Sequence, residues 1–456
     1  MSKTKSTYFC QNCGAQSAKW IGKCPSCNEW NTYVEEIINK KEEEKFTWRD
    51  RKNQQNYTPI PQKLEEIADN ENERNSTEDI ELDRVLGGGL VKGSLILLGG
   101  EPGIGKSTLL LQVALQVKNQ RVLYVSGEES GSQIKLRAER IKQSNTDFYI
   151  ITETNTQKIF QHTKELKPQL VIIDSIQTIF TDSIESTPGS VSQIRECAAE
   201  MQRYAKENGV SVLLVGHITK DGSIAGPKVL EHIVDVVLQF EGDHNYLYRI
   251  LRTLKNRFGS TNEIGLYEMN SNGLKIVDNP SQLLLTDRSD EMSGISIAST
   301  MEGLRPMMAE IQALVSNAVY GTAQRSATGF DVRRLHMLLA VLEKRAGYKI
   351  AMKDVFLNIA GGFKLIDPAM DLAVIASIMS SYEDQAIPYK YAFAGEVGLS
   401  GEVRSVTRVE QRIAEAQKLG FEKIFISSYA LKGIQQKYTI QIVPVSKVYE
   451  LLKLLF

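Results

Sequence analysis

One segment combines glycines, a lysine and hydroxyl side chains in an order that suits phosphate binding. It reads GEPGIGKST and consists of Gly100, Glu101, Pro102, Gly103, Ile104, Gly105, Lys106, Ser107 and Thr108. Glycines allow successive backbone N–H groups to turn inward around phosphate oxygens, and a helix that follows adds the partial positive charge of its N-terminus. In this pattern the lysine reaches the β- and γ-phosphates and the serine hydroxyl binds Mg²⁺. The segment is therefore predicted to bind ATP through these residues, with Ser107 as a magnesium ligand.

Acidic side chains stand at the ends of two other apolar runs. The run at residues 169–174 ends in Asp174, and the run at residues 121–126 is followed by Glu128 and Glu129. An aspartate at the end of such a strand holds Mg²⁺ in P-loop ATPases. A glutamate at a neighbouring strand end can act as the general base that activates the attacking water. The sequence predicts a second magnesium ligand at Asp174 and a catalytic base at Glu128, with Glu129 as the alternative.

These side chains need a fold that brings strand ends together. Further apolar runs cover residues 95–98, 148–152 and 211–216, and apolar residues continue at helical spacing from Leu109. Alternating strands and helices with near-continuous apolar strands are typical of a parallel sheet covered on both faces, and ligands bind at the carboxyl ends of its strands. His217 follows the run at 211–216. At that edge a histidine is either a sensor of the γ-phosphate or a hydrogen-bonded core residue.

Four of the five cysteines lie close to the N-terminus. Cys10 and Cys13 form one CxxC pair and Cys24 and Cys27 form another, with ten residues between the pairs. Two such pairs can hold one metal ion, and four thiolates around one ion are typical of structural Zn²⁺. A redox pair or an iron centre is the alternative. The fifth, Cys197, lies in a predicted helix and is expected to pack as a small apolar side chain.

Composition narrows the class of protein. The 456 residues are 42% hydrophobic and 24% charged, as in ordinary globular proteins, and the net charge is −1. A nucleic-acid surface would therefore have to be local. No apolar run has membrane-spanning length, and the polar N-terminus lacks the apolar core of a secretory signal. A cytoplasmic protein with no membrane contact is expected.

The order of these motifs resembles that of the RecA-like ATPases. Together with the cysteine pairs, further segments resemble the bacterial RadA family: LDRVLGGGL at 82–90, YVSGEES at 124–130, IIDSIQT at 172–178 and KNRFG at 255–259. The resemblance covers nearly the whole chain. It implies an ATP hydrolase of DNA repair and recombination that binds single-stranded DNA and assembles as a homohexamer. It also implies a helicase-like motor that drives branch migration of branched DNA beside a recombinase of the RecA type.

The KNRFG segment supplies two cations. A strand predicted at 246–254 would present Lys255 and Arg257 on a tight turn. The resemblance implies that this motif couples DNA binding to the nucleotide state, and cations here can reach the γ-phosphate of a neighbouring subunit. The alternative is an ordinary solvated turn. Both residues are predicted to act in catalysis and in DNA binding.

Two segments after strands match the places where RecA-like proteins have mobile DNA loops. They cover residues 181–195 and 219–231, and the second contains Lys220 and Lys228, which are predicted DNA contacts. Neither segment has an aromatic residue. Base stacking is therefore not evident there, and weakly sequence-selective binding is expected.

The C-terminal part invites a rival hypothesis. Residues 391–403 and a helix predicted at 409–419 resemble the proteolytic domain of Lon proteases, which suggests an ATP-dependent protease. However, Ala369 aligns with the nucleophilic serine and Glu410 with the catalytic lysine. Without nucleophile and base there is no acyl-enzyme route. Basic residues on a helix predicted at 333–345 either contact DNA or form a solvated face.

The predicted fold class is α/β, with a RecA-like P-loop core between a Cys₄ zinc module and a Lon-protease-like domain. The zinc module covers residues 1–39, a linker with one short helix near 64–68 covers 40–75, the ATPase covers 76–280, and the proteolytically inactive domain covers 281–456. Predicted cofactors are ATP, Mg²⁺ and Zn²⁺. Besides the protease, a regulatory RecA-like ATPase without a DNA role is the alternative function.

Overall fold

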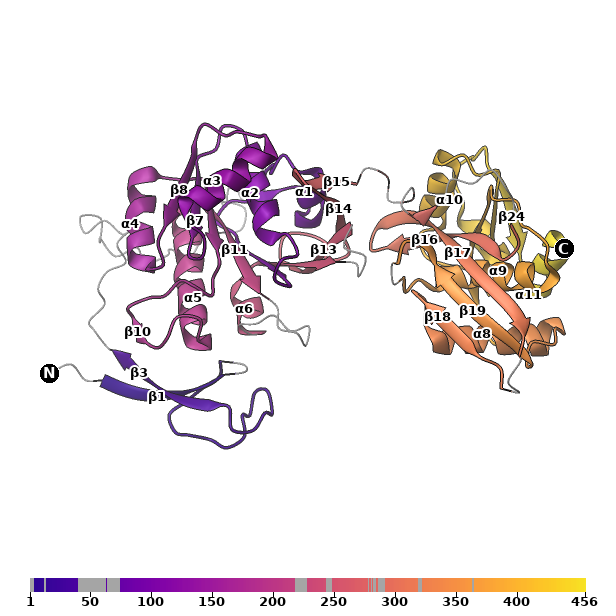
Figure 1. Ribbon diagram of the computed structural model, residues 1–456, viewed down its shortest axis with the longest axis horizontal. Coiled ribbons are helices and arrows are strands. Elements are labelled where there is room, and N and C mark those ends of the chain that lie inside the picture. Colours follow the sequence, from indigo (N-terminus) through magenta and orange to yellow (C-terminus); the bar gives the residue numbers. More distant parts are fainter. Residues whose placement is uncertain are drawn as a thin grey trace. The chain divides into compact units, whose positions relative to one another are not determined.

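The chain folds into two compact units. The computed structural model describes residues 4–11, 14–39, 63, 74–217, 228–242, 248–277, 279, 281, 284–285, 292–318, 322–362 and 365–456. One unit extends to Ile276 and the other runs from Val277 to Phe456, and each has an α/β architecture (Figure 1). The short helix predicted near residues 64–68, and most of the predicted linker, lie outside the described residues.

The first unit is built on a nine-stranded sheet. Its strands are β6 (Leu95–Gly100), β7 (Val122–Ser126), β8 (Phe148–Thr152), β9 (Leu170–Asp174), β11 (Ser211–His217), β12 (Val236–Gly242), β13 (Tyr248–Asn256), β14 (Ile264–Asn270) and β15 (Gly273–Ile276). The order is β15-β14-β13-β12-β6-β11-β9-β7-β8. From β12 to β8 neighbouring strands are parallel, as predicted, whereas β13, β14 and β15 extend the sheet in antiparallel fashion.

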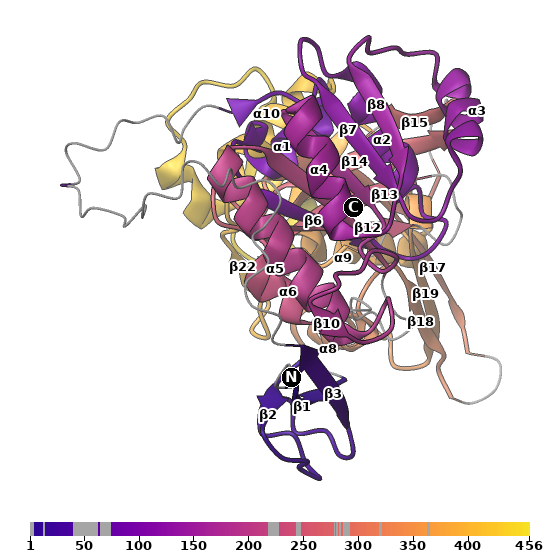
Figure 2. The ribbon, with the colours of Figure 1, turned by 90° about the vertical axis from the view of Figure 1, so that its left-hand side faces the viewer.

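Helices on both faces explain why the strands are apolar throughout. Leu95 and Leu97 of β6 belong to one hydrophobic core, and Ile96 and Leu98 belong to the other. The first core includes α4 (Thr156–Leu166), α5 (Val191–Asn208) and α6 (Lys228–Ile233), and the second includes α1 (Ile80–Leu86), α2 (Lys106–Gln116) and α3 (Gly131–Ile141). Both helix layers can be followed in Figure 2. Side chains that alternate along a strand must all be apolar when both faces are buried.

Local sequence signals determine where the helices begin and end. Asp79 accepts hydrogen bonds from backbone N–H groups in the first turn of α1, and Ser130 and Gln133 form a capping box at the start of α3. Helix α5 begins after Ser190 and ends at Gly209, whose φ of 64° favours glycine. A two-residue pair, β4 (Arg74–Asn75) with β5 (Leu90–Val91), brackets α1.

A small antiparallel sheet forms the N-terminal domain. It contains β1 (Thr4–Cys10), β2 (Gln16–Ser17) and β3 (Tyr33–Asn39), and β10 (Ile184–Glu185) pairs with the edge of β3. Figure 2 shows β10 beside β3. In addition, Nη1 of Arg195 donates to the backbone oxygen of Gly14 at 2.9 Å. The segment after β9, where a DNA loop is predicted, is thus joined to the N-terminal domain.

The second unit has a seven-stranded mixed sheet. Its strands are β16 (Ile295–Glu302), β17 (Arg305–Asn317), β18 (Arg325–Thr328), β19 (Lys353–Ile359), β20 (Tyr391–Ala394), β23 (Lys423–Ser427) and β24 (Gln441–Val445). The order is β18-β19-β17-β16-β20-β23-β24. The remaining elements are α8 (Val332–Ala346), α9 (Asp371–Glu383), α10 (Val409–Lys418), α11 (Val448–Leu455), the hairpin β21 (Glu396–Val397) and β22 (Val403–Arg404), and the 3-10 turns η4 (Ala360–Gly362), η5 (Pro368–Met370) and η6 (Ser428–Gly433).

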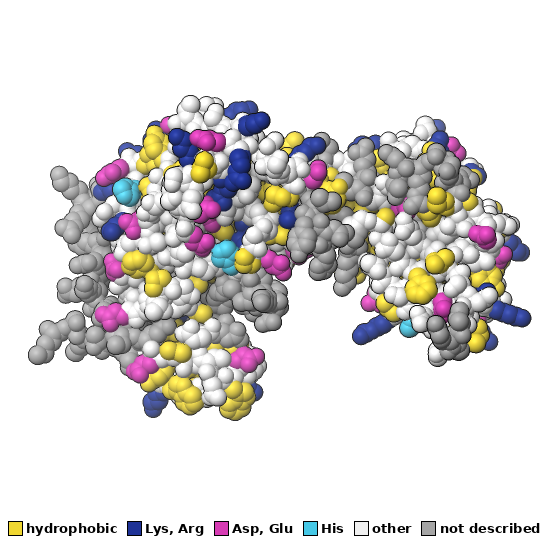
Figure 3. Space-filling model, viewed as in Figure 1, with side chains coloured by type: hydrophobic (Ala, Val, Ile, Leu, Met, Phe, Trp, Pro, Cys, Tyr) yellow, Lys and Arg dark blue, Asp and Glu magenta, His cyan; other side chains and the backbone are white. Residues whose placement is uncertain are grey.

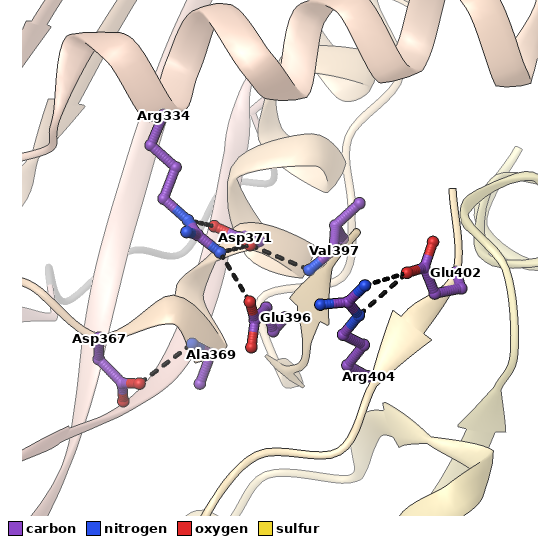
Figure 4. A network of polar contacts seen from close by, with 8 residues as sticks. All are labelled: Arg334, Asp367, Ala369, Asp371, Glu396, Val397, Glu402 and Arg404. Carbon is purple, nitrogen blue, oxygen red and sulfur yellow. Dashed lines mark hydrogen bonds and ion pairs between the residues drawn. The ribbon is translucent and has the colours of Figure 1, made fainter. Parts of the chain in front are cut away.

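A polar network lies around the first turn of α9 (Figure 4). Nε of Arg334 donates to Oδ1 of Asp371 at 2.6 Å, and Nη2 of Arg334 lies 3.5 Å from a carboxylate oxygen of Glu396. Asp371 also accepts from the backbone N–H of Val397 at 2.9 Å. Burial raises the pKa of Asp371, and the Arg334 guanidinium opposes this effect. Arg334 therefore does not belong to a purely solvated basic face, because it is held inside its own unit.

A second ion pair is almost completely buried. Nη1 of Arg412, on α10, lies 2.7 Å from Oδ2 of Asp367 and donates to the backbone oxygen of Ser299, and the Arg412 side chain is 1% exposed. Asp367 also accepts from the backbone N–H groups of Met301 and Ala369.

No helix in the described part of the chain is long and apolar enough to cross a membrane.

The Asp367→Ala variant should be destabilised. Removal of this carboxylate leaves the buried Arg412 guanidinium without its counter-charge, which typically costs about 3 kcal/mol of free energy of unfolding. Chemical denaturation of the full chain, followed by circular dichroism, measures this loss. The control is Glu422→Ala, which breaks an exposed ion pair with Lys390 and should leave the transition unchanged. Equal stability of Asp367→Ala and wild type would contradict the assignment.

Candidate functional site

The glycine loop lies between β6 and α2, as the sequence predicts. β6 ends at Gly100 and α2 begins at Lys106. Gly103 and Gly105 have φ values of 78° and 114°, which L-residues rarely adopt. A β-carbon on Gly105 would lie 2.7 Å from Cε of Met269, so a side chain there would displace the end of the methionine. This is the strand, loop and helix geometry that directs backbone N–H groups at a phosphate.

Lys106 is buried at the centre of this loop. Its side chain is 4% exposed, and Nζ donates to the backbone oxygens of Gly100 at 2.8 Å and Glu101 at 2.9 Å. Burial lowers the pKa of Lys106 to about 8, although Asp174, Glu128 and Glu101 act in the opposite direction. A cation held among three carboxylates and the loop carbonyls is placed to bind a polyphosphate.

Asp174 ends β9 and is held by a buried tyrosine. Ser126 of β7 pairs in register with Asp174, which is 8% exposed. The hydroxyl of Tyr124 donates to Oδ2 of Asp174 at 2.5 Å. Burial, followed by the Asp174 charge, raises the pKa of Tyr124 well above its usual value, so the hydroxyl stays a donor. This bond orients the carboxylate, whose other oxygen, together with the Ser107 hydroxyl, could hold Mg²⁺.

Glu128 lies next to Asp174 at the same edge of the sheet. Its Oε1 accepts from the Ser175 hydroxyl at 2.7 Å and lies 3.5 Å from Nε2 of His217. The Glu128 side chain is about half exposed, at 46%. Nδ1 of His217 is buried and has no hydrogen-bond partner among the described residues. A β-carbon on Gly127 would lie 2.0 Å from Oγ1 of Thr178, so the chain turns into Glu128 where only glycine fits.

Glu129 has a different environment. Its Oε2 is paired with Nη2 of Arg137 on α3 at 2.5 Å, and its backbone N–H and carbonyl oxygen both bond to the hydroxyl of Ser126. Its carboxylate is thus already neutralised by an arginine. Of the two adjacent glutamates, Glu128 faces Ser175 and His217, and Glu129 faces α3.

The antiparallel extension of the sheet supports the loop from the side. Arg249 of β13 is buried, and its Nε donates to the backbone oxygen of Ile104 at 3.0 Å. Met269 of β14 approaches Gly105, as described above. The sequence motifs predicted no role for these two residues, nor for Tyr124 and Ser175. Tyr124 and Ser175 lie within the YVSGEES and IIDSIQT segments, whereas Arg249 and Met269 carry no motif because strand pairing alone brings them to the site.

Lys255 and Arg257 are placed differently from the expectation. The strand predicted at 246–254 is in fact β13, which continues to Asn256 because its ladder with β12 reaches Asn256. Lys255 is therefore inside a strand, and its Nζ donates to the backbone oxygens of Glu231 and Val234 at the end of α6. Burial is the main cause of a lowered Lys255 pKa.

Arg257 follows the end of β13 and is half exposed. Its Nη1 lies 3.1 Å from Oδ1 of the buried Asp235. Oδ2 of Asp235 in turn accepts from the backbone N–H of Leu95 at the start of β6. The prediction that a tight turn presents both cations is thus wrong for Lys255, which lies inside β13, whereas Arg257 follows the strand in a bend. Both side chains are bound within the first unit. Of the predicted DNA contacts, Lys220 lies outside the described residues, as does the side chain of Lys228.

Three of the four N-terminal cysteines converge. The Sγ atoms of Cys10, Cys24 and Cys27 all lie within 4.8 Å of one another, and Cys13 lies outside the described residues. The turns after Cys10 and Cys24 are alike. The backbone N–H of Gly14 donates to the carbonyl oxygen of Cys10, that of Asn28 donates to the carbonyl oxygen of Cys24, and both donors have positive φ. Cys10 and Cys24 are buried. Converging buried thiols on two such turns fit a tetrahedral thiolate site. Cys197, in contrast, is buried in the core of the first unit, as expected.

Comparison with known proteins identifies the family. The chain is 50% identical over 457 residues to a protein of Streptococcus pyogenes serotype M6 named DNA repair protein RadA, and the alignment covers 100% of both chains. It is 49% identical to the protein of the same name from Bacillus subtilis strain 168, with 99% of both covered. The chain belongs to the RadA family of DNA repair proteins.

Family models match three parts of this RadA-family chain. A model described as an AAA domain matches residues 61–223, one described as a rubredoxin metal binding domain matches residues 8–35, and one described as subunit ChlI of Mg-chelatase matches residues 313–429. The predicted fold class is confirmed: an N-terminal zinc ribbon, a RecA-like P-loop ATPase core and a ChlI/Lon-like domain. A solved KaiC-like protein from Pyrococcus horikoshii OT3 aligns with 45% of this chain and 99% of its own, at 20% identity and a TM-score of 0.38.

The pKa of Lys106 predicts pH-dependent nucleotide binding. Phosphate charge favours the ammonium form, so above a pKa of about 8 binding must be accompanied by proton uptake at Lys106. The affinity for a non-hydrolysable ATP analogue should be flat below pH 8 and fall by up to about tenfold per pH unit above it. Calorimetry in buffers of different ionisation enthalpy measures both the affinity and the proton uptake.

Lys106→Arg is the matched control for this titration. Arginine keeps its charge across the range, so its affinity should lose the decline above pH 8. A wild-type protein that takes up no proton on binding at pH 9 would contradict the buried, partly deprotonated lysine.

Proposed function

We propose that this RadA-family protein hydrolyses ATP and uses the reaction to drive branch migration, acting as a homohexamer on single-stranded and branched DNA. The observation that carries the proposal is the meeting of Lys106, Asp174 and Glu128 at one edge of a parallel sheet. Phosphoryl transfer needs a cation for the phosphates, a carboxylate for Mg²⁺ and a base for water. The membership of the RadA family supports the link to DNA repair.

Each residue then has a defined task. The backbone of residues 100–108 and Lys106 bind the phosphates, and Ser107 and Asp174 would hold Mg²⁺, which supplies charge neutralisation between the phosphate oxygens. Glu128 takes the proton of the attacking water. The Ser175 hydroxyl orients Glu128, and His217, 3.5 Å away, can report on the charge of Glu128 and of the γ-phosphate.

Coupling to DNA rests on the contact between Lys255 and α6. The segment at 219–231, predicted to contact DNA through Lys220 and Lys228, leads into α6, and the Lys255 ammonium binds the last carbonyls of that helix. β13 carries both Lys255 and Arg249. Nε of Arg249 donates to the backbone oxygen of Ile104 in the phosphate loop. A shift of α6 on DNA would therefore be transmitted along one strand to the nucleotide. Arg257, half exposed beside Asp235, could reach a neighbouring subunit's nucleotide.

The N-terminal cysteines would hold Zn²⁺ as a structural ion. Cys10, Cys24 and Cys27 would supply three thiolates. Cys13, which forms a CxxC pair with Cys10, would supply the fourth. With no open ligand position the ion would stabilise the fold without taking part in hydrolysis.

A recombinase of the RecA type is the proposed partner of the whole assembly.

The alternative of a protease is disfavoured. Ala369 is buried at the N-terminal end of α9, where a nucleophilic serine would be needed, and a methyl group cannot attack a peptide bond (Figure 4). Glu410 accepts from the backbone N–H groups of Gln435 and Gln436, so its carboxylate is used structurally. Absence of peptide cleavage in assays with casein is expected.

The alternative of a regulatory ATPase without a DNA role is disfavoured by the RadA family membership.

Glu128→Gln should abolish hydrolysis without loss of ATP binding. The amide cannot accept a proton, and loss of a general base typically lowers turnover by about 10²–10⁴-fold. Phosphate release and the affinity for an ATP analogue are measured side by side. Glu129→Gln is the matched control and should retain most of the turnover, since Glu129 is paired with Arg137. If the two variants exchanged behaviour, Glu129 would be the base.

Lys255→Ala should keep nucleotide binding and lose stimulation by DNA. The variant breaks two charge-assisted bonds to the end of α6, and such bonds contribute about 1.5–3 kcal/mol each, so the stimulation by single strands should fall by about tenfold or more. ATP turnover is measured with and without a single-stranded oligonucleotide. Lys118→Ala, which removes an exposed lysine of the same unit, should behave as wild type. Full stimulation in Lys255→Ala would disprove the coupling.

A further inference from the structure

Two tryptophans of the zinc ribbon are exposed to solvent. Trp20 is 55% exposed and Trp30 is 67% exposed, and Ile21 between them is also exposed. Figure 3 shows hydrophobic side chains gathered on this domain. The described hydrophobic cluster of the ribbon includes Cys10, Cys24 and Tyr33 but neither indole. The two indoles therefore do not build the core of the ribbon, and exposed indoles of this size usually mark a binding surface.

Both indoles lie beside Gly22. Cη2 of Trp20 and Cζ3 of Trp30 come within 3.6 Å and 3.9 Å of the point where a β-carbon on Gly22 would lie. A backbone bridge between Lys23 and Trp30, and a hydrogen bond from the N–H of Asn31 to the carbonyl of Gly22, hold the two turns together. The aromatic pair is thus a fixed feature of the ribbon. We call Trp20, Gly22 and Trp30 the indole face.

Two lysines border the indole face. Nζ of Lys23 lies 5.7 Å from the centre of the Trp30 ring, and Lys19 directly precedes Trp20 and is exposed. Glu29 is the one acidic residue between positions 14 and 34, so this surface is slightly cationic. Aromatic rings flanked by cations are the elements of surfaces that bind single-stranded nucleic acids, because rings stack on bases and cations contact phosphates.

The position of the ribbon in the first unit supports the same ligand. β3 pairs with β10, and Arg195 binds Gly14, so the ribbon is joined to the segment at 181–195, where a DNA loop is predicted. That segment and the one at 219–231 have no aromatic residue. The ribbon therefore supplies the stacking surface that the predicted loops of the ATPase lack.

We propose that the indole face binds single-stranded DNA by stacking bases on Trp20 and Trp30, with Lys19 and Lys23 as phosphate contacts. This inference rests on the proposed function, since it assigns part of the DNA binding to a named surface. Stacking on every base is similar in strength, so the contact should have little sequence preference.

Intrinsic fluorescence gives a direct test. The chain has three tryptophans, and only Trp48 lies outside the indole face. In full-length, zinc-loaded Trp48→Phe protein, all indole emission comes from the indole face. Addition of oligo-dT should quench this emission in a saturable way with the same midpoint as binding measured by anisotropy of a labelled strand. Binding without quenching would overturn the inference.

The double variant Trp20→Ala/Trp30→Ala tests the contribution to affinity. Stacking contributes about 1–3 kcal/mol per base, so the affinity for single strands should fall by about tenfold to a hundredfold or more. Trp20→Phe/Trp30→Phe retains rings and should restore most of the affinity. Leu136→Ala, which removes an exposed apolar side chain of α3, should have no effect. Zinc content equal to wild type confirms that the ribbon is intact.

The outcomes separate this inference from the proposed function. If wild type binds single strands and the double variant binds equally well, the indole face serves another partner, such as a protein or a second copy of the chain, and the inference is wrong while the proposed function stands. If wild type neither binds single strands nor shows DNA-stimulated turnover, the proposed function fails as well.

Discussion

The register of the parallel ladder is the constraint on which the nucleotide site depends. Gly100 at the end of β6 aligns with His217 of β11, and Asp174 of β9 aligns with Ser126 of β7. Because the strands end level with one another, a buried ammonium comes to lie among carboxylates from three different segments. Burial of the Lys106 charge is unfavourable by itself, as its lowered pKa of about 8 shows, and the surrounding acids offset part of that cost. A slip of one strand would separate these charges.

Side chains for which the motifs predicted no role orient the groups that have predicted roles. Tyr124 is buried within the sheet and directs a hydroxyl at Asp174, while Ser175 does the same for Glu128. The antiparallel strands add a second level of support, because Arg249 and Lys255 leave the same strand, one toward the phosphate loop and the other toward α6. A single strand, with a bulge at Leu254, therefore contacts both the nucleotide loop and the helix at the end of a predicted DNA segment. This arrangement gives a physical route between the two activities that we propose.

The second unit has the fold of a ChlI/Lon-like domain, and two ion pairs stabilise its interior. Ion pairs between Arg334 and Asp371 and between Arg412 and Asp367 lie around the start of α9, where the peptide-bond chemistry of Lon proteases would take place. Such pairs need several hydrogen bonds to balance desolvation, and both aspartates also accept backbone N–H groups. The first pair joins α8 to α9 and to the β21 hairpin, and the second joins α10 to β16, which suits a structural domain.

The sequence alone determined the parallel α/β core, the phosphate loop and the cysteine pairs, because hydrophobic period, glycine spacing and CxxC spacing are local properties of the chain. Only the tertiary structure decided which glutamate faces the site, since Arg137 approaches Glu129 from α3 and Ser175 approaches Glu128 from the position directly after β9. It also decided the surroundings of Lys255: the ladder of β13 with β12 extends past Leu254 and directs the ammonium at α6. The pairing of the ribbon with β10 likewise depends on a contact between segments far apart in the chain, and the position of both indoles beside Gly22 depends on the contact between two turns of the ribbon. Local patterns specify elements, whereas the direction of a side chain depends on neighbours that only the folded chain provides.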